Sequence, residues 1–408
     1  MILAASLSVA ALRCGAANCA RQDGAEAVAT KNASASRPDQ GACSFDLEFL
    51  KDLLRMSTET VDLDENNRCV EFMRGYLSSR GVHCTVLTNE KGRSSLYAAT
   101  APGKVHDYLF VSHVDVVPAC SPAQYEPSID GDWLSARGAC DTKGNVAVIA
   151  QVLVNLAGKA SVGAFIATDE DGPTKEKGTP TPQFAIDAGY VPRRFIMVGD
   201  SAGEAPDQLF TAEKGHARLQ LIAHGRGGHS SVPWSLDNPI PKLVAGYAKV
   251  LAAQPPAPTV DDRWHDCLSP TMLRGSDAGN QIPDAAVMTL SLRFIEMDGL
   301  DKWIGFLRET SGLEVRSYGT YRLPVVSDPN NADTQRLLAS LRRRCPATRL
   351  GKMSAATDAS YYAPLGVPTV IFAAKGEGPH AALERVSLKS LSDYVDAFTE
   401  FLSAEQPK

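Results

Sequence analysis

The sequence predicts an α/β fold that is interrupted by a second, ferredoxin-like α+β unit. In the first half of the chain, short apolar runs alternate with helical patterns, and this order builds a parallel sheet covered by helices. Between about residues 214 and 325 the order becomes strand, helix, strand, strand, helix, strand, which is the ferredoxin-like order. The α/β pattern then returns, so one domain is inserted into another.

The composition is that of an ordinary folded protein. The 408 residues are enough for two or three domains, and 44% hydrophobic with 22% charged residues is a common balance. The formal net charge is −6 and no basic stripe is present, so nucleic acid is not an expected partner. No apolar run approaches the roughly 20 residues that a membrane span needs, so no span is expected.

Residues 1–42 differ in kind from the rest. The apolar run 1–12 has about the length of a signal-peptide core. The tract that follows is rich in Ala, Ser, Asn and Gln, has no periodicity and is typical of a disordered linker. We therefore expect an exported protein of the periplasm or cell envelope. No positive residue precedes the apolar run, so a cytoplasmic location stays open.

The first part of the α/β domain, residues 43–213, begins with helical spacing of apolar residues. The run 145–156 is apolar nearly all round and predicts a buried helix. The other apolar runs are short and predict buried strands. The expected helices are 49–54, 70–77 and 145–156, and the expected strands are 82–87, 96–100, 108–111, 162–168 and 195–198.

The inserted domain, residues 214–325, and the second part of the α/β domain, residues 326–408, follow by the same criteria. The last helix carries a clear apolar stripe. The inserted domain is expected to contain strands 217–224, 268–273, 287–294 and 313–316 with helices 240–253 and 300–307. The last part is expected to contain helix 336–341, strand 368–373 and helix 391–402.

An imidazole and a carboxylate follow the apolar run 108–111. His113 and Asp115 lie two residues apart, so in an extended chain they point the same way. In open α/β sheets the chemistry lies beyond the carboxyl ends of the strands. The pair suits a metal-binding imidazole whose second ring nitrogen is held by a carboxylate.

Other candidate ligands also follow strands or lie in loops. Two imidazoles and several carboxylates match a borderline cation such as Zn²⁺. If one carboxylate is shared, each imidazole serves its own metal, and a further carboxylate must move the proton. The candidates are His113, Asp141, the run Asp169-Glu170-Asp171, Asp200 and His380.

These motifs, in this order and with the inserted domain, resemble the co-catalytic zinc hydrolases that include acetylornithine deacetylase, succinyl-diaminopimelate desuccinylase, aminoacylase and glutamate carboxypeptidase. The resemblance covers about residues 45–402. It implies a zinc-peptidase-like mixed sheet flanked by helices. It also implies that the inserted ferredoxin-like domain is a lid and dimerisation domain, and that the protein is a homodimer.

The resemblance assigns a role to each candidate. It implies two divalent metal ions, zinc first, with cobalt or manganese as alternatives. It implies Glu170 as general base and Asp115 as the partner of a ligand imidazole. The implied ligands are His113 and Asp200 on one metal, Asp171 and His380 on the other, and Asp141 between them.

The inserted domain would supply contacts to the substrate. The resemblance implies that Asn280 and Arg293 bind it and that His229 reaches the active site of the partner chain. An arginine is the natural bidentate partner for a substrate carboxylate. A histidine at the developing oxyanion would stabilise the transition state.

One position departs from the family pattern. The family usually has glutamate where this chain has Asp171. Aspartate is one methylene shorter, so the metal must lie closer to the loop or bind less tightly. Metal affinity, rather than the fold, depends on this difference.

The expected function is hydrolysis of an amide bond in a small N-acyl amino acid or dipeptide-like substrate. Two alternatives stay open. A carboxypeptidase or dipeptidase of the same family is mildly favoured by aspartate, rather than glutamate, at position 200. A catalytically degenerate binding protein is favoured only by the aspartate at position 171.

Overall fold

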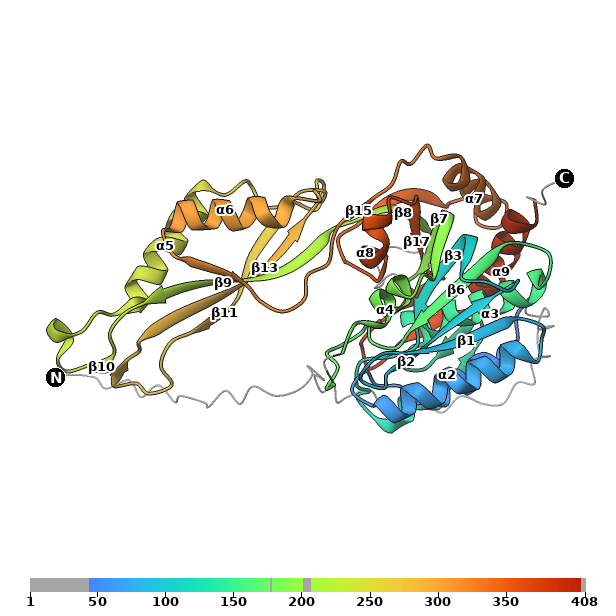
Figure 1. Cartoon of the computed structure of the whole chain (residues 1–408), viewed down its shortest axis with the longest axis horizontal. Helices are drawn as coiled ribbons and strands as arrows, with labels where there is room; N and C mark the ends of the chain where they lie inside the picture. Colours follow the sequence, from blue (N-terminus) through green and yellow to red (C-terminus); the bar gives the residue numbers. More distant parts are fainter. Residues whose placement is uncertain (1–43, 177, 201–206, 405–408) are drawn as a thin grey trace, which may run out of the picture.

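The computed structural model describes residues 44–176, 178–200 and 207–404, so the expected export signal and linker lie outside the described residues. A larger α/β unit and a smaller sheet-and-helix unit are joined by long extended segments (Figure 1). Among the described residues, no helix combines the length and the apolar character that crossing a membrane requires.

The α/β unit is built on a nine-stranded mixed sheet, as the family resemblance implied. Its order is β1-β2-β6-β3-β7-β17-β8-β15, with β16 paired to β8. Strands β6, β3, β7 and β17 run parallel to one another. The pairs β1–β2, β2–β6, β17–β8 and β8–β15 are antiparallel, and β16 is parallel to β8. The strands are β1 (His83–Thr88), β2 (Ser94–Ala99), β3 (Val105–His113), β6 (Val162–Ala167), β7 (Val191–Gly199), β8 (Gln208–Glu213), β15 (Val325–Val326), β16 (Arg349–Met353) and β17 (Thr369–Phe372).

Helices cover both faces of this sheet. Tyr108 and Phe110 of β3 face one apolar core, and Leu109 and Val111 face the other, so the strand is buried on both sides as predicted. The first core is closed by α1 (Leu47–Arg55), α2 (Leu63–Ser78), α3 (Gly144–Leu156), α7 (Ala332–Arg342) and α9 (Leu388–Ser403). The second is closed by α4 (Thr181–Asp187) and α8 (Ala359–Tyr362).

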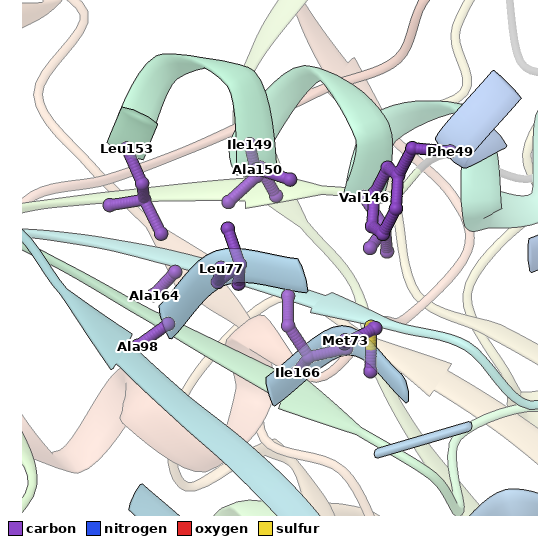
Figure 2. Close-up of a pocket in the computed structure, with 10 residues that line it drawn as sticks. All are labelled: Phe49, Met73, Leu77, Ala98, Val146, Ile149, Ala150, Leu153, Ala164 and Ile166. Atoms are coloured by element: carbon purple, nitrogen blue, oxygen red, sulfur yellow. The ribbon is translucent and has the colours of Figure 1, made fainter. Parts of the chain in front are cut away.

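Figure 2 shows a narrow apolar gap within the first core. Side chains of α3 point toward those of α2 and of the sheet, and all ten lining residues are apolar. A substrate site needs a few polar groups that fix the ligand, and this gap has none. The gap is therefore a packing feature and is not part of the candidate site. Its lining residues are Phe49, Met73, Leu77, Ala98, Val146, Ile149, Ala150, Leu153, Ala164 and Ile166.

The smaller unit has the predicted ferredoxin-like topology. Its sheet has the order β11-β13-β9-β14, which is second, third, first and fourth in the chain, and all pairs are antiparallel. Two helices pack on one face through side chains such as Leu243 and Leu307. The elements are β9 (Gly215–His224), α5 (Pro239–Ala253), β11 (Cys267–Arg274), β13 (Ala285–Phe294), α6 (Gly299–Ser311) and β14 (Glu314–Ser317), with a small pair β10 (Gly228–His229) and β12 (Gln281–Ile282).

The sequence reasoning did not anticipate a small four-stranded sheet beside the α/β unit. Its order is β18-β19-β5-β4. No strand in it exceeds three residues, so neither alternation nor an apolar run marks it. The strands are β4 (Ser128–Asp130), β5 (Trp133–Ser135), β18 (Gly376–Glu377) and β19 (Arg385–Ser387).

The last helix anchors the strand that leads to His113. The ring of Phe398 in α9 lies 5.1 Å from that of Phe110 in β3 and 4.5 Å from that of Phe372 in β17, measured between centroids. All three rings are fully buried. We expect Phe398→Ala to lower the free energy of unfolding by about 3–5 kcal/mol, because it leaves a cavity in this cluster.

Guanidinium unfolding followed by circular dichroism measures this loss. Asp396→Ala, at an exposed position of the same helix, is the matched control and should change the stability by no more than about 0.5 kcal/mol. Equal stabilities of the two variants would contradict the anchoring role of the ring.

Candidate metal centre

Three neighbouring parallel strands end at one edge of the sheet, and each leads to a candidate residue. His113 is the last residue of β3, which lies between β6 and β7. Glu170 follows shortly after β6, and Asp200 directly follows β7. The parallel order therefore brings together residues that lie far apart in the sequence.

The first group of candidate ligands surrounds His113. Its Nε2 atom lies 3.4 Å from Oδ1 of Asp141 and 3.8 Å from Oδ2 of Asp200. The imidazole is 1% exposed, and this nitrogen has no hydrogen-bond partner among the residues that the structure describes. A buried polar nitrogen without a partner needs an explanation, and a cation held between it and the carboxylates provides one.

The second group surrounds His380. Its Nε2 atom lies 3.1 Å from Oδ2 of Asp141 and 3.0 Å from Oδ1 of Asp171. The two oxygens of Asp141 thus face two different imidazoles. This is the arrangement that a carboxylate shared by two cations requires.

The protonation preferences show an excess of negative charge. Burial raises the pKa of Asp200 to about 8, and the carboxylates of Asp141 and Asp171 add to that shift. Hydrogen bonds to Asp141 and Asp171 raise the pKa of His380 to about 10. Burial opposes the charge on His113, but the neighbouring carboxylates raise its pKa well above the ordinary value. Bound cations would relieve the same repulsion.

Asp115 has a wider role than the sequence suggested. The Nδ1 atom of His113 lies 3.0 Å from the main-chain carbonyl oxygen of Asp115, and the carboxylate oxygen is farther, at 3.5 Å. The Asp115 carboxylate instead accepts from Thr60 Oγ1 at 2.7 Å and from the main-chain N–H groups of Glu170 and Asp171 at 3.2 and 3.0 Å. Asp115 therefore orients the imidazole through its main chain and fixes the acidic loop through its side chain.

Glu170 lies beside the first group. One of its carboxylate oxygens is close enough to His113 and Asp200 that geometry alone would also allow it as a ligand. Burial raises its pKa well above the ordinary value, and the carboxylate of Asp200 contributes. A carboxylate that prefers to hold a proton, next to the candidate metal positions, suits a general acid/base role.

Glu384 is a residue that sequence reasoning missed. Its carboxylate accepts from the main-chain N–H groups of Gly138 at 2.9 Å and of Cys140 and Asp141 at 3.1 Å each. It also accepts from Arg137 Nη1 at 2.6 Å. The same guanidinium donates to the main-chain oxygen of His380 at 3.3 Å.

Glu384 thus links the segment that carries Asp141 to the loop that carries His380. The side chain is 1% exposed, and an acidic residue is rarely buried without such partners. No signal in a single sequence marks it, because its partners lie more than 240 positions away.

The three residues of the inserted unit that were predicted to contact the substrate do not lie together. Two are at its far tip, and one is near the candidate metal centre's side of the unit. His229 lies in β10, at the end of the inserted unit farthest from the sheet of the α/β unit (Figure 1). Asn280 is beside it, because its carbonyl accepts from the N–H of Ser230 at 2.9 Å. Arg293 lies at the other end of β13 and pairs with His216 near the junction of the two units.

The donor set fits a divalent cation of the zinc type. Imidazole nitrogens and carboxylate oxygens converge in two groups, His113–Glu170–Asp200 and Asp141–Asp171–His380, and in each group the ligand atoms lie within 4.8 Å of one another. Such mixed nitrogen and oxygen sets are typical of zinc, and of cobalt and manganese to a lesser degree. Cys140 does not join them; burial raises the pKa of its thiol, as expected for a buried filler.

Residues 109–404 match the sequence profile of Peptidase family M20/M25/M40. The chain belongs to this family. Membership confirms the family that the motifs predicted, and it makes this M20 protein a hydrolase of a metal-dependent family.

Relatives of this M20 protein include succinyl-diaminopimelate desuccinylases. The Wolbachia pipientis enzyme of Culex pipiens is 27% identical over 267 residues, which cover 62% of this chain and 66% of that enzyme. The Gluconobacter oxydans enzyme is 31% identical over 229 residues, which cover 52% of this chain and 58% of that enzyme. The match thus spans less than two thirds of these two relatives. The Gluconacetobacter diazotrophicus enzyme is 25% identical over 390 residues, which cover 87% of this chain and 96% of that enzyme.

Solved structures share the fold. Aminopeptidase PepT of Bacillus cereus superposes with a TM-score of 0.69 at 15% identity, covering 88% of this chain and 99% of that one. An M20 metallo-carboxypeptidase of Sulfolobus solfataricus superposes with a TM-score of 0.67 at 14% identity, covering 88% and 98%. At this identity the likeness shows the fold alone, and it confirms the predicted architecture.

We expect Glu384→Gln to weaken binding of the metal between Asp141 and His380 by about 10–100-fold, the usual effect of removing a residue that orients ligands. An amide keeps one acceptor oxygen, but it cannot accept from both Arg137 and the main chain of Asp141. Competition between the protein and a zinc chelator measures the affinity.

The matched control is Glu377→Gln, in the strand just before the same loop, whose side chain forms an exposed ion pair with Arg385. Its affinity should equal that of the wild type. An unchanged affinity in a folded Glu384→Gln variant would remove Glu384 from the support of the centre.

Proposed function

We propose that this M20 protein is a dinuclear metal-dependent amidohydrolase that cleaves the amide bond of a small N-acyl amino acid or short peptide. The observation that carries the proposal is the position of Asp141, whose two oxygens lie 3.4 and 3.1 Å from the Nε2 atoms of His113 and His380. A carboxylate between two imidazoles is the expected arrangement of a bridging ligand. The names of the relatives support an acylamino-acid substrate.

Each cation would have its own set of ligands. His113 and Asp200 would hold one, Asp171 and His380 the other, and Asp141 both. When bound, two such cations polarise the substrate carbonyl and make water more acidic. Zinc is the first choice of metal, with cobalt and manganese as alternatives.

Glu170 would move the proton. Its main-chain N–H is held by Asp115 at 3.2 Å, and its side chain is close enough to His113 and Asp200 to be a third ligand. In this scheme Asp141 takes that place, which leaves Glu170 free to transfer protons. It would take a proton from the attacking water and deliver it to the nitrogen of the leaving amine. The first transfer needs the ionised carboxylate and the second needs the acid, so a carboxyl group whose pKa burial raises above its ordinary value can serve in both forms.

The position of the Asp171 carboxylate supports an enzyme rather than a degenerate binding protein, although its side chain is shorter than the family's usual glutamate. Its Oδ1 atom reaches to 3.0 Å from Nε2 of His380, and its Oδ2 accepts from the N–H of Val117 at 3.1 Å. The loop therefore compensates for the missing methylene. A carboxylate that still reaches the second group favours an enzyme over a binding protein.

A homodimer would complete the active site. Large apolar side chains are exposed on α5, on the edge strand β11 and in the loop after β10, and an edge strand with such neighbours favours pairing with another chain. His229 and Asn280 lie together at the tip of the inserted unit, where a partner chain could receive them. The exposed residues are Trp234, Val244, Leu251, Met272 and Leu273.

Two further proposals concern organisation. We place the inserted domain at about residues 214–325, since β8 of the large sheet ends at Glu213 and the chain re-enters that sheet in β15 (Val325–Val326). We also propose export to the periplasm or cell envelope, on the composition of residues 1–42 alone.

A substrate panel with a catalytic control tests the function. Zinc-reconstituted protein should hydrolyse at least one member of a panel of N-acyl amino acids, including N-succinyl ones, and dipeptides. Glu170→Gln should lower kcat by about 10²–10⁴-fold while keeping the metal content, because a general acid/base is lost and no ligand is removed. Product formation and metal analysis give both numbers.

Glu126→Gln, at an exposed position, is the control and should keep full activity. Loss of metal from Glu170→Gln would make Glu170 a ligand and refute its role as base. Dipeptide hydrolysis without deacylation would assign the protein to the peptidase branch.

If each active site contains residues of both chains of a dimer, two different inactive subunits should restore activity when they are combined. His229→Ala should lower kcat by about 10²–10³-fold with metal retained, because a donor to an oxyanion contributes roughly 3–4 kcal/mol. In a mixed dimer of His229→Ala and Glu170→Gln subunits, one site combines the intact Glu170 of one chain with the intact His229 of the other. Activity should therefore return after subunit exchange, as measured by steady-state turnover.

Each variant taken through the same exchange procedure with itself is the control and should stay inactive. No return of activity after verified exchange would mean that His229 acts within its own chain or not at all.

A further inference from the structure

The two chain segments that join the units pair with each other. Lys214 connects β8 to β9, and the segment 318–324 connects β14 to β15. His216 N–H donates to the carbonyl of Arg322 at 2.9 Å, and Arg322 N–H donates to the carbonyl of His216 at 2.7 Å. β15 continues the pairing with β8, where Val325 faces Glu213. The connection is therefore a two-stranded ribbon that runs from one sheet into the other (Figure 1).

Arg322 extends from this ribbon into the candidate metal centre. Its Nη1 lies 3.1 Å from Oδ1 of Asp358, and its Nη2 lies 3.8 Å from Oε1 of Glu170. The guanidinium carbon lies 4.4 Å from the ring centre of Tyr361. Its side chain is 17% exposed. The main chain of Arg322 thus belongs to the junction, while its charged group lies among side chains of the α/β unit.

The opposite strand of the ribbon contacts the turn that carries Asp358, the partner of Arg322. Glu213 Oε2 accepts from the N–H of Thr357 at 2.9 Å and from its hydroxyl at 2.8 Å. Thr357 directly precedes Asp358, the main partner of Arg322. Both strands of the ribbon are therefore fixed to one turn, and this turn sets the position of the guanidinium.

Glu170 needs such support. Its main chain is held by Asp115, and among the described residues Arg322 is the ion-pair partner of its carboxylate. Asp200 and Asp358 both repel the charge on Glu170. Without a cation on the side of the ribbon, the carboxylate would turn away from these neighbours.

We propose that Arg322 is a positioning residue for the general base, which ties the carboxylate of Glu170 to the ribbon between the two units. The inference rests on the proposed function, because it takes Glu170 as the base. Arg322 binds no metal in this scheme, because a guanidinium stays protonated in proteins and offers only N–H donors.

The shape of the side chain matters as well as its charge. A planar guanidinium can face Asp358 with one nitrogen and Glu170 with another while its flat side lies against Tyr361. A lysine ammonium is a single point charge and cannot meet all three requirements. Arg322→Lys therefore keeps the positive charge near Glu170 but loses the contacts that position the carboxylate, so this variant separates the two effects.

The test compares Arg322→Met and Arg322→Lys in the zinc-reconstituted protein, using the best substrate of the panel. Arg322→Met should lower kcat by about 10–100-fold, the effect of a small misplacement of a catalytic group. Arg322→Lys should recover part of this loss. In both variants KM should stay within about twofold of the wild type, since Arg322 does not bind the substrate, and the metal content should be unchanged.

Arg316→Met is the matched control. Arg316 lies in β14, just before the same ribbon, but its guanidinium pairs with exposed Glu314 rather than with the metal centre. Its kcat, KM and metal content should equal those of the wild type.

Three results would overturn the proposal. One is a wild-type kcat in Arg322→Met. Another is a loss in which KM or metal content changes as much as kcat. The third is an equal kcat loss in Arg322→Lys and Arg322→Met. If Arg322→Met does not fold, Arg322→Lys decides alone: a lowered kcat with KM and metal retained supports the proposal, and a wild-type kcat overturns it. The proposed function itself fails only if the wild type hydrolyses no amide or if Glu170→Gln keeps full activity.

Discussion

The candidate metal centre depends on one feature of the fold: several carboxylate side chains lie close together beyond the carboxyl ends of β6, β3 and β7. Asp115, Asp141 and Asp200 are buried there, and the side chains of the half-buried residues Asp171 and Glu170 are only 5% and 14% exposed. Buried charges of one sign are costly unless cations or hydrogen bonds compensate for them. Two imidazoles and the guanidinium of Arg322 offset only part of this charge, so the arrangement favours divalent cations. By holding the candidate ligands together in advance, the fold would lower the cost of ordering them around a metal.

Groups outside the ligand sets keep the ligands in place. The Asp115 carboxylate fixes the N–H groups of Glu170 and Asp171, and the Glu384 carboxylate fixes the segment of Asp141. Each of these carboxylates accepts several N–H donors, and such donors stabilise the charged form at a buried position. The same contacts join segments that are far apart in the chain, so the centre forms only when the whole α/β unit has folded.

The sequence was informative where function coincides with a local pattern. His113 and Asp200 follow apolar strands, and the acidic run that contains Glu170 follows another, so their place at one edge of a sheet could be predicted. The ferredoxin-like order of the inserted unit was equally readable. Glu384 and Arg322 could not be found in this way, because an acidic residue in a loop and a basic residue in a linker look like surface residues. Their partners, Asp141 and Asp358, are 243 and 36 positions away and are brought close only by the tertiary fold.

The inserted unit separates two groups of predicted substrate contacts. Arg293 lies near the junction with the α/β unit, whereas His229 and Asn280 lie at the far tip, with the ten-residue strand β13 between them. Such a strand spans about 30 Å, at roughly 3.3 Å per residue. A rigid sheet of this length cannot bring its tip back to the centre of its own chain. If all three residues contact one substrate, two copies must lie side by side in opposite directions, so that the tip of each reaches the junction of the other. The length of β13 and the position of His229 then explain why this hydrolase carries an inserted domain with an exposed apolar edge.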